Sequence, residues 1–116
     1  MLDFYVDPRG ITVFSKTTCP YCVKAIQILN DYSVKLQIYE LDSISNRQSI
    51  SNNLKKQTGR STVPNIFVYG KNIGGYEELK RMADSGELSS IIKTNTSRQI
   101  NYDYFDNGFN DWGAPF

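Results

Sequence analysis

The sequence predicts an α/β domain with a central four-stranded mixed sheet flanked by helices. Short β-rich runs alternate with segments in which apolar residues recur at helical spacing. The last pair of β-rich runs is separated by only a few turn-forming residues. The expected order is therefore β-α-β-α-β-β-α, in which a parallel pair of strands acquires an antiparallel hairpin at its edge.

The first half of the domain is predicted to be a strand–helix–strand–helix series. Residues 11–14 form a β-rich run after a turn signal, which indicates a buried strand. Pro20 suits the first position of a helix. Residues 35–41 alternate apolar and polar side chains like a strand, and residues 42–59 read as a polar helix that opens on Asp-Ser and ends at a glycine. The apolar stripe of the first helix comprises Val23, Ile26 and Leu29, with Cys22, Ala25 and Ile28 nearby.

The second half contains the hairpin. Residues 62–69 are β-rich and contain a proline near their start. Residues 70–72 are the expected turn, and Ile73 lies in the returning strand, which a pair of glycines then ends. Residues 76–84 and 87–93 read as short helices.

Residues 94–116 differ from the rest, so we expect a domain over residues 1–93 followed by a C-terminal tail. The tail is rich in Asn, Asp, Ser and Gly and shows no helical or strand periodicity, yet it contains several aromatic residues. We favour packing of the tail onto its own domain over a short linear motif that binds a partner. The aromatic residues are Tyr102, Tyr104, Phe105, Phe109, Trp112 and Phe116.

Composition and charge restrict the function classes. Among 116 residues, 13 Lys and Arg against 12 Asp and Glu leave a net charge of +1, which gives no electrostatic reason to expect a nucleic-acid or anionic-membrane partner. The chain has no histidine, which excludes Ser/His/Asp and Cys/His catalysis and imidazole metal sites. Without a secretory signal or an apolar run of about 20 residues, the expected setting is the reducing cytoplasm. We also expect a monomer.

The only two cysteines, Cys19 and Cys22, follow a β-rich run and open a helix. Residues three apart share a helix face, so both sulfurs can meet. The amino end of the helix favours a thiolate, and Lys16 adds a positive charge nearby. We therefore predict redox chemistry, in which Cys19 attacks a disulfide and Cys22 resolves the product.

Other interpretations of the cysteine pair are weaker. A structural disulfide across so short a loop removes little unfolded-state entropy, and the cytoplasm would reduce it. A thiolate–imidazole zinc site needs four ligands, which a chain with two cysteines and no histidine cannot supply. Ordinary burial of both cysteines remains open, although Cys19 precedes a proline at a helix entrance.

Three motifs together resemble the dithiol glutaredoxins: Thr18-Cys19-Pro20-Tyr21-Cys22, Thr62-Val63-Pro64 and Gly74-Gly75-Tyr76. The resemblance covers about residues 10–93. It implies a thioredoxin-like fold and glutathione-dependent thiol–disulfide exchange, with glutathione as cosubstrate and no metal. Cys19 then resembles the nucleophile that accepts glutathione, and Cys22 the resolving cysteine.

The resemblance also implies how glutathione binds. Pro64 matches the family's cis-proline, and the backbone of Val63 would pair with the cysteine backbone of glutathione. The γ-glutamyl carboxylate would lie at the start of the next helix, at Tyr76 and Glu77, where the sequence departs from the family's usual Ser, Thr or Asp. Glu78 is interpreted as complementing the helix dipole. The expected glutathione-binding residues are Lys16, Tyr21, Lys56, Thr62, Val63, Pro64, Gly75, Tyr76 and Glu77.

The glycyl carboxylate of glutathione needs a cation or an amide donor at the other end. Lys16 matches the family's basic residue before the cysteine motif, and Lys56 falls where relatives often have glutamine. Arg60 is a third candidate, ranked last. Each of the three could instead be a solvated surface charge.

The leading hypothesis is an enzyme that reduces protein–glutathione mixed disulfides and protein disulfides. The alternative is an iron–sulfur cluster-binding scaffold that takes one cysteine from each of two chains plus glutathione; it is ranked low because Pro20 stiffens the site. A third possibility is thioredoxin-like electron transfer from a reductase protein without glutathione. The expected partners are glutathione and disulfide or glutathionylated client proteins.

Overall fold

The computed structural model describes residues 5–103, with side chains through residue 95. The described residues divide into two compact units, one up to residue 83 and one from residue 84. The first unit holds the sheet and the cysteine pair. The second contains helix α4 (Glu87–Asp103).

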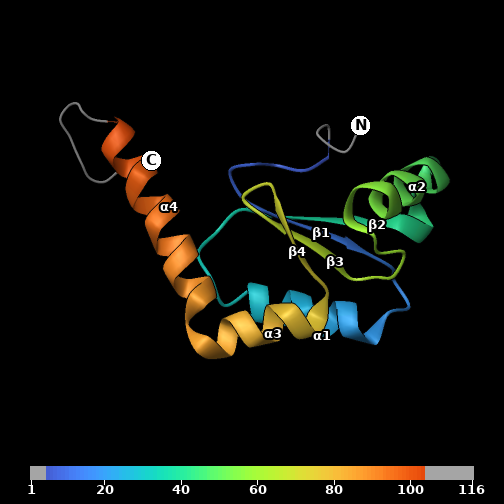
Figure 1. Ribbon diagram of the computed structural model, residues 1–116, viewed down its shortest axis with the longest axis horizontal. Coiled ribbons are helices and arrows are strands. Elements are labelled where there is room, and N and C mark those ends of the chain that lie inside the picture. Colours follow the sequence, from blue (N-terminus) through green and yellow to red (C-terminus); the bar gives the residue numbers. More distant parts are fainter. Residues whose placement is uncertain (1–4, 104–116) are drawn as a thin grey trace. The chain divides into compact units, whose positions relative to one another are not determined.

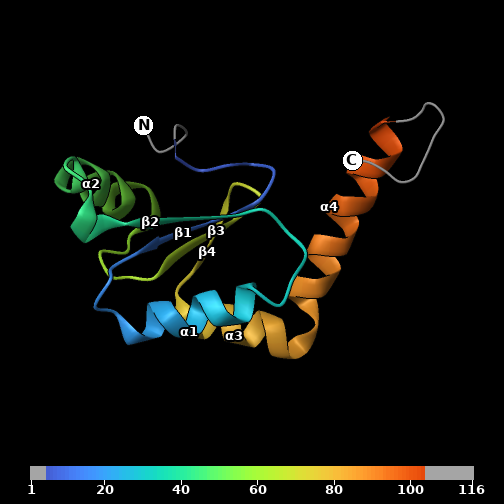
Figure 2. The ribbon, with the colours of Figure 1, turned by 180° about the vertical axis from the view of Figure 1, so that it is seen from behind.

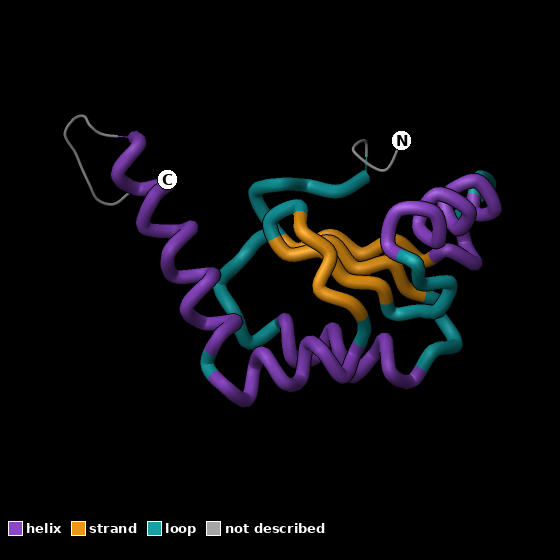
Figure 3. Tube along the Cα trace, in the orientation of Figure 1, coloured by secondary structure: helices purple, strands orange, loops and turns teal. Residues whose placement is uncertain are grey.

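The sheet has four strands in the order β2-β1-β3-β4 (Figures 1 and 3). Strand β1 pairs in parallel with β2 and antiparallel with β3, and β3 pairs antiparallel with β4. This arrangement confirms the predicted mixed sheet, a parallel pair extended by an antiparallel hairpin. The strands are β1 (Ile11–Ser15), β2 (Leu36–Glu40), β3 (Asn65–Val68) and β4 (Lys71–Gly74).

Helices cover both faces of the sheet (Figures 1 and 2). Helices α1 (Pro20–Leu29) and α3 (Tyr76–Ser85) lie on one face, and α2 (Arg47–Thr58) lies on the other. Among the described residues, no helix is long and apolar enough to cross a membrane.

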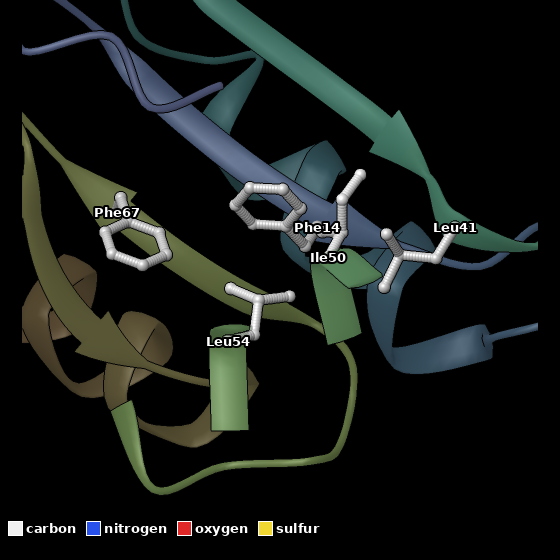
Figure 4. Close-up of a cluster of buried hydrophobic side chains, with 5 residues drawn as sticks. All are labelled: Phe14, Leu41, Ile50, Leu54 and Phe67. Atoms are coloured by element: carbon white, nitrogen blue, oxygen red, sulfur yellow. The ribbon is translucent and has the colours of Figure 1, made fainter. Parts of the chain in front are cut away.

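The core under α2 is built around Phe14, whose side chain is fully buried (Figure 4). Its ring stacks on Tyr39, with centroids 5.5 Å apart, and meets Phe67 edge-to-face at 5.9 Å. Because β1 is central, its side chains are buried against helices on both faces. The cluster comprises Phe14, Leu41, Ile50, Leu54 and Phe67.

The predicted stripe of α1 is wrong at Val23, whose side chain is 51% exposed. The buried face is formed by Cys22, Ala25 and Leu29. Two apolar stripes overlap along this helix and share Leu29, so periodicity alone could not decide between them. The face that packs in the core carries the second cysteine.

The helix predicted over residues 42–59 begins five residues later than expected, at Arg47. Residues Leu41–Ser43 form a separate 3₁₀ helix, η2. The side chain of Asp42 is not available as a helix cap because it accepts hydrogen bonds from Thr17. The predicted end is confirmed: Gly59 adopts a left-handed conformation, with φ 77°, and its N–H bonds the carbonyl of Lys55.

The hairpin turn lies at Tyr69 and Gly70 rather than over residues 70–72, because Val68 pairs directly with Lys71. Tyr69 has φ 50° and Gly70 has φ 84°. A two-residue type I′ turn requires positive φ at both central residues, and a tyrosine rarely adopts that conformation. For this reason the sequence predicted the turn at Gly70 and the two residues that follow it, and not at Tyr69.

Helix α4 continues to Asp103 instead of ending at residue 93. Residues 94–103 lack an apolar stripe, the signal used for the prediction, but they also contain neither glycine nor proline to end a helix. Tyr102 falls in this helix. The other tail aromatics, Tyr104, Phe105, Phe109, Trp112 and Phe116, lie outside the described residues.

Candidate active site

Cys19 is the residue that caps the amino end of α1. Its backbone is extended, and its Sγ accepts a hydrogen bond from the Cys22 N–H at 3.1 Å. Pro20 occupies the first helical position, where no backbone N–H is needed. The Cys19 sulfur also lies 3.8 Å from the Val63 carbonyl oxygen, to which the thiol can donate. Cys19, which is partly exposed, is thus held at a helix start where the Cys22 backbone N–H points toward its sulfur.

Cys22 differs from Cys19 although it is one turn away. Its side chain is 1% exposed. Burial, together with a side-chain hydrogen bond to the Cys19 thiol, raises the pKa of the Cys22 thiol to about 11. The pair therefore presents one accessible sulfur and one buried, protonated sulfur beneath it.

This difference predicts selective alkylation of the reduced protein. At pH 7, iodoacetamide is expected to add one group, on Cys19, because Cys22 is inaccessible and its pKa of about 11 keeps it protonated. Peptide mass mapping after a short exposure reads the result, with urea-unfolded protein as the control that takes up both groups. Equal labelling of the two cysteines in the folded protein would contradict the described burial.

A pocket of about 400 Å³ lies close to Cys19. The Val63–Pro64 bond, part of its wall, is cis. The Tyr21 and Tyr76 rings approach to 5.4 Å between centroids, and the Lys24 Nζ lies 5.3 Å from the centre of the Tyr21 ring. The lining residues are Tyr21, Arg60, Val63, Pro64, Tyr76, Glu77 and Glu78. The pocket thus joins α1, the loop before β3 and the start of α3.

The start of α3 is capped by Glu78, a residue of the first turn of the same helix. The Glu78 Oε1 accepts a hydrogen bond from the Gly75 N–H at 2.8 Å, which is one of the two hydrogen bonds of a capping box. This bond lowers the pKa of the Glu78 carboxyl, and the positive charges of Arg60 and Arg81 lower it further. The contact agrees with the structural role expected for Glu78, although its side chain also borders the pocket.

Arg60 reaches the same helix start from the loop before β3. Its Nη1 is 4.0 Å from the Glu78 Oε1. A Cβ atom added to Gly75 would lie 2.5 Å from the Arg60 Nη2, so the glycine leaves room for the guanidinium. Sequence reasoning ranked Arg60 last among the cations because nothing in the linear order shows that this loop folds against α3.

The structure brings together some of the expected glutathione-binding residues. Five of them line the pocket: Tyr21, Val63, Pro64, Tyr76 and Glu77. Gly75 is buried beside the Arg60 guanidinium, and Thr62 borders a neighbouring cavity of about 20 Å³. The side chains of Lys16 and Lys56 are exposed and do not line the pocket.

The segment before Cys19 is tied to η2. The Asp42 carboxylate accepts hydrogen bonds from the Thr17 N–H at 3.1 Å and from the Thr17 hydroxyl at 2.5 Å. These bonds lower the pKa of the Asp42 carboxyl, and the positive charge of Lys16 adds to the effect. Sequence analysis missed this contact because the two residues are 25 positions apart.

Asp42→Asn is expected to weaken the protein in a pH-dependent way. The folded-state pKa of Asp42 lies below its ordinary value of 3.8, so the carboxylate contributes stability above that pH and loses it as the pH falls through the folded pKa. In urea titrations, wild type should exceed Asp42→Asn at pH 7, and the difference should vanish at low pH. An unchanged difference at pH 3 would show that the charge is irrelevant.

The sequence model of the family Glutaredoxin matches residues 11–73. Over 87 residues the chain is 40% identical to a glutaredoxin of Vernicia fordii, spanning 75% of this chain and 84% of that relative. The chain belongs to the glutaredoxin family. It is a glutathione-dependent disulfide oxidoreductase with a thioredoxin-like fold, and its two cysteines have the dithiol spacing.

Solved structures of the family are similar in fold. The buckwheat glutaredoxin–glutathione complex superposes with a TM-score of 0.71 at 33% identity and is covered over 79% of its length by 75% of this chain. The holo form of glutaredoxin C1 from Populus tremula x tremuloides gives 0.70 at 35% identity, with 74% of this chain matching 85% of that chain.

Proposed function

We propose that this glutaredoxin reduces protein–glutathione mixed disulfides and protein disulfides through Cys19-Pro20-Tyr21-Cys22, with Cys19 as the nucleophile. The observation that carries the proposal is the position of the Cys19 sulfur. It caps α1, accepts the Cys22 N–H, and lies beside Val63, which lines the pocket. A thiolate is the form of cysteine that attacks disulfides, and the Cys22 N–H supplies a hydrogen-bond donor to it.

Reduction of a glutathionylated protein uses Cys19 alone. The Cys19 thiolate attacks the glutathione sulfur, the bond between the two substrate sulfurs breaks, and the protein thiolate leaves with its electron pair. A free glutathione thiolate then attacks the glutathione sulfur bound to Cys19. Glutathione disulfide leaves and Cys19 returns as a thiolate. One half of the glutathione disulfide comes from the glutathionylated protein and the other half from free glutathione.

Reduction of a protein disulfide uses both cysteines. Cys19 forms a mixed disulfide with one sulfur of the client, and Cys22 then loses its proton and attacks the Cys19 sulfur. The client leaves as a dithiol, and the Cys19–Cys22 disulfide is reduced by two glutathione molecules. The pKa of about 11 at Cys22 means that this resolving step needs proton removal as the sulfur attacks.

Glutathione binding is proposed to follow the pocket. The backbone of Val63 pairs with the cysteine of glutathione, Pro64 and Tyr21 border the sulfur, and the γ-glutamyl end reaches Tyr76 and Glu77. Lys16 and Lys56 are kept as candidates for the glycyl carboxylate, with Thr62 and Gly75 as supporting residues. The similar buckwheat glutaredoxin is a complex with glutathione, which supports glutathione as the ligand.

The proposed setting is a reducing compartment such as the cytoplasm, where the protein acts as a monomer on client proteins. In the described residues no group of three or more His, Cys, Asp or Glu side chains could hold a metal ion. If the cluster-binding alternative held instead, two chains would share an iron–sulfur cluster. Anaerobic purification would then give visible absorption and a dimer.

The test of the proposed function is steady-state reduction of a small glutathione mixed disulfide, with glutathione reductase reporting the glutathione disulfide formed. We expect turnover that requires glutathione, and none when thioredoxin reductase and NADPH replace glutathione and its reductase. Turnover supported only by thioredoxin reductase would favour the thioredoxin-like alternative. Inactivity of the fully reduced protein with both systems would refute the proposal.

A further inference from the structure

We propose that Arg60 binds the α-carboxylate of the γ-glutamyl arm of glutathione and thereby determines which mixed disulfides the site accepts. The proposal rests on the glutathione-dependent function above. It replaces the expectation that Arg60, if it binds at all, would meet the glycyl carboxylate. Arg60 lies outside the three motifs that carry the family resemblance.

The first argument is the position of the guanidinium. Arg60 lines the pocket and lies near the start of α3, with Nη1 4.0 Å from the Glu78 Oε1 and Nη2 against Gly75. Tyr76 and Glu77, the residues proposed for the γ-glutamyl arm, follow Gly75 directly. Arg60 is therefore at the γ-glutamyl end of the pocket.

The second argument is charge. Among the described residues that line the pocket, Arg60 is the cation, whereas Glu77 and Glu78 are anionic. The γ-glutamyl arm carries a carboxylate, which two glutamates would repel. Without Arg60 the described residues that line the pocket would offer the carboxylate no positive charge. The exposed Lys16 and Lys56 do not line the pocket and do not supply the missing charge.

The third argument is that the guanidinium has donors to offer. Its contact with Glu78 is long, at 4.0 Å, and the side chain is 35% exposed. The Arg60 Nε is buried and has no hydrogen-bond partner in the described part of the chain. A guanidinium presents its donors as a planar fork that matches a carboxylate, so it can hold the ligand while Glu78 stays on Gly75.

The experiment compares mixed disulfides truncated at either end. A short cysteine peptide is joined to glutathione, to γ-glutamylcysteine or to cysteinylglycine, and each is mixed with reduced full-length protein carrying Cys22→Ser. In the reaction that is measured, Cys19 attacks the sulfur of glutathione or its fragment and forms a mixed disulfide with it, and the peptide thiolate leaves. Intact mass spectrometry of acid-quenched samples gives the fraction of protein that carries the adduct on Cys19. The time course of this fraction gives a second-order rate constant for each substrate.

Arg60→Gln in this background is expected to lower the rate constants for glutathione and γ-glutamylcysteine about tenfold, the loss typical of one charge-assisted hydrogen bond. The rate constant for cysteinylglycine, which lacks the γ-glutamyl carboxylate, should not change. Arg60→Lys should restore part of the loss because it keeps the charge but not the fork. The matched control is Arg47→Gln, an exposed arginine at the start of α2, which should leave all three rate constants unchanged.

Each other outcome overturns the proposal in a distinct way. An equal loss in all three rate constants would assign Arg60 a structural role. A loss only for cysteinylglycine and glutathione would show that Arg60 binds the glycyl carboxylate instead. No loss would make it a surface charge. If the Cys22→Ser parent formed no glutathione adduct on Cys19 at all, the proposed function itself would fail, whatever Arg60 does.

Discussion

Cys19→Ser is expected to abolish reduction of glutathione mixed disulfides, a loss of about a thousandfold or more, because the hydroxyl that replaces the thiol cannot form the enzyme–glutathione intermediate. Cys22→Ser should keep most of this activity, since free glutathione can attack the adduct on Cys19. The same variant should lose reduction of a protein disulfide, which needs the second sulfur. The two assays, run on wild type and both variants, therefore separate the one-cysteine and two-cysteine reactions.

The exposure of the two sulfurs explains this asymmetry. Cys19 is partly exposed and Cys22 is buried beneath it, so an incoming disulfide meets Cys19 first. A Cys19→Ser protein that still reduced glutathione mixed disulfides would remove the basis of the proposed mechanism. Circular dichroism of each variant serves as the control for folding.

Phe14→Ala is expected to destabilise the fold by about 3–5 kcal/mol, the range seen when a buried aromatic side chain is truncated. The Phe14 ring is fully buried and contacts Tyr39 and Phe67, so its removal leaves a cavity between the sheet and α2. The free energy of unfolding of a domain is usually about 5–15 kcal/mol, so this single change removes a large part of the stability. Urea unfolding followed by circular dichroism should show a much lower midpoint with a similar slope.

Val23→Ala provides the comparison for Phe14→Ala. Val23 is also apolar, but its side chain is 51% exposed on α1, so the change should fall within about 0.5 kcal/mol. A comparable loss for the two variants would mean that Val23 is covered in solution. A loss below about 1 kcal/mol for Phe14→Ala would contradict the described packing around its ring.

The sequence was most informative where one local signal decided the structure. The parallel pair, the hairpin and the helix that opens on Cys19 all follow from short runs whose period changes at a proline or a glycine. The spacing of Cys19 and Cys22 predicted that both sulfurs meet, and the side-chain hydrogen bond between the two thiols agrees with that.

Sequence reasoning was weaker where distant residues compete for a group. Asp42 looked like a helix cap but bonds Thr17 instead, so α2 begins later. The contact of Arg60 with the start of α3 depends on how a loop folds back, and no local pattern records it. Such contacts between segments far apart in the chain cannot be predicted without the fold.

The hydrogen bond from the Cys22 N–H to the Cys19 sulfur has a consequence for the reduction potential. A sulfur in a disulfide carries no net charge and accepts hydrogen bonds weakly, so this bond favours the reduced pair over the oxidised pair. For a two-electron couple, about 1.4 kcal/mol of such preference raises the potential by about 30 mV and makes the dithiol a weaker reductant. Because the donor is a backbone group held by α1, helix geometry partly sets the reduction potential of the cysteine pair. Substitutions at Pro20 that alter the start of the helix should therefore change this potential.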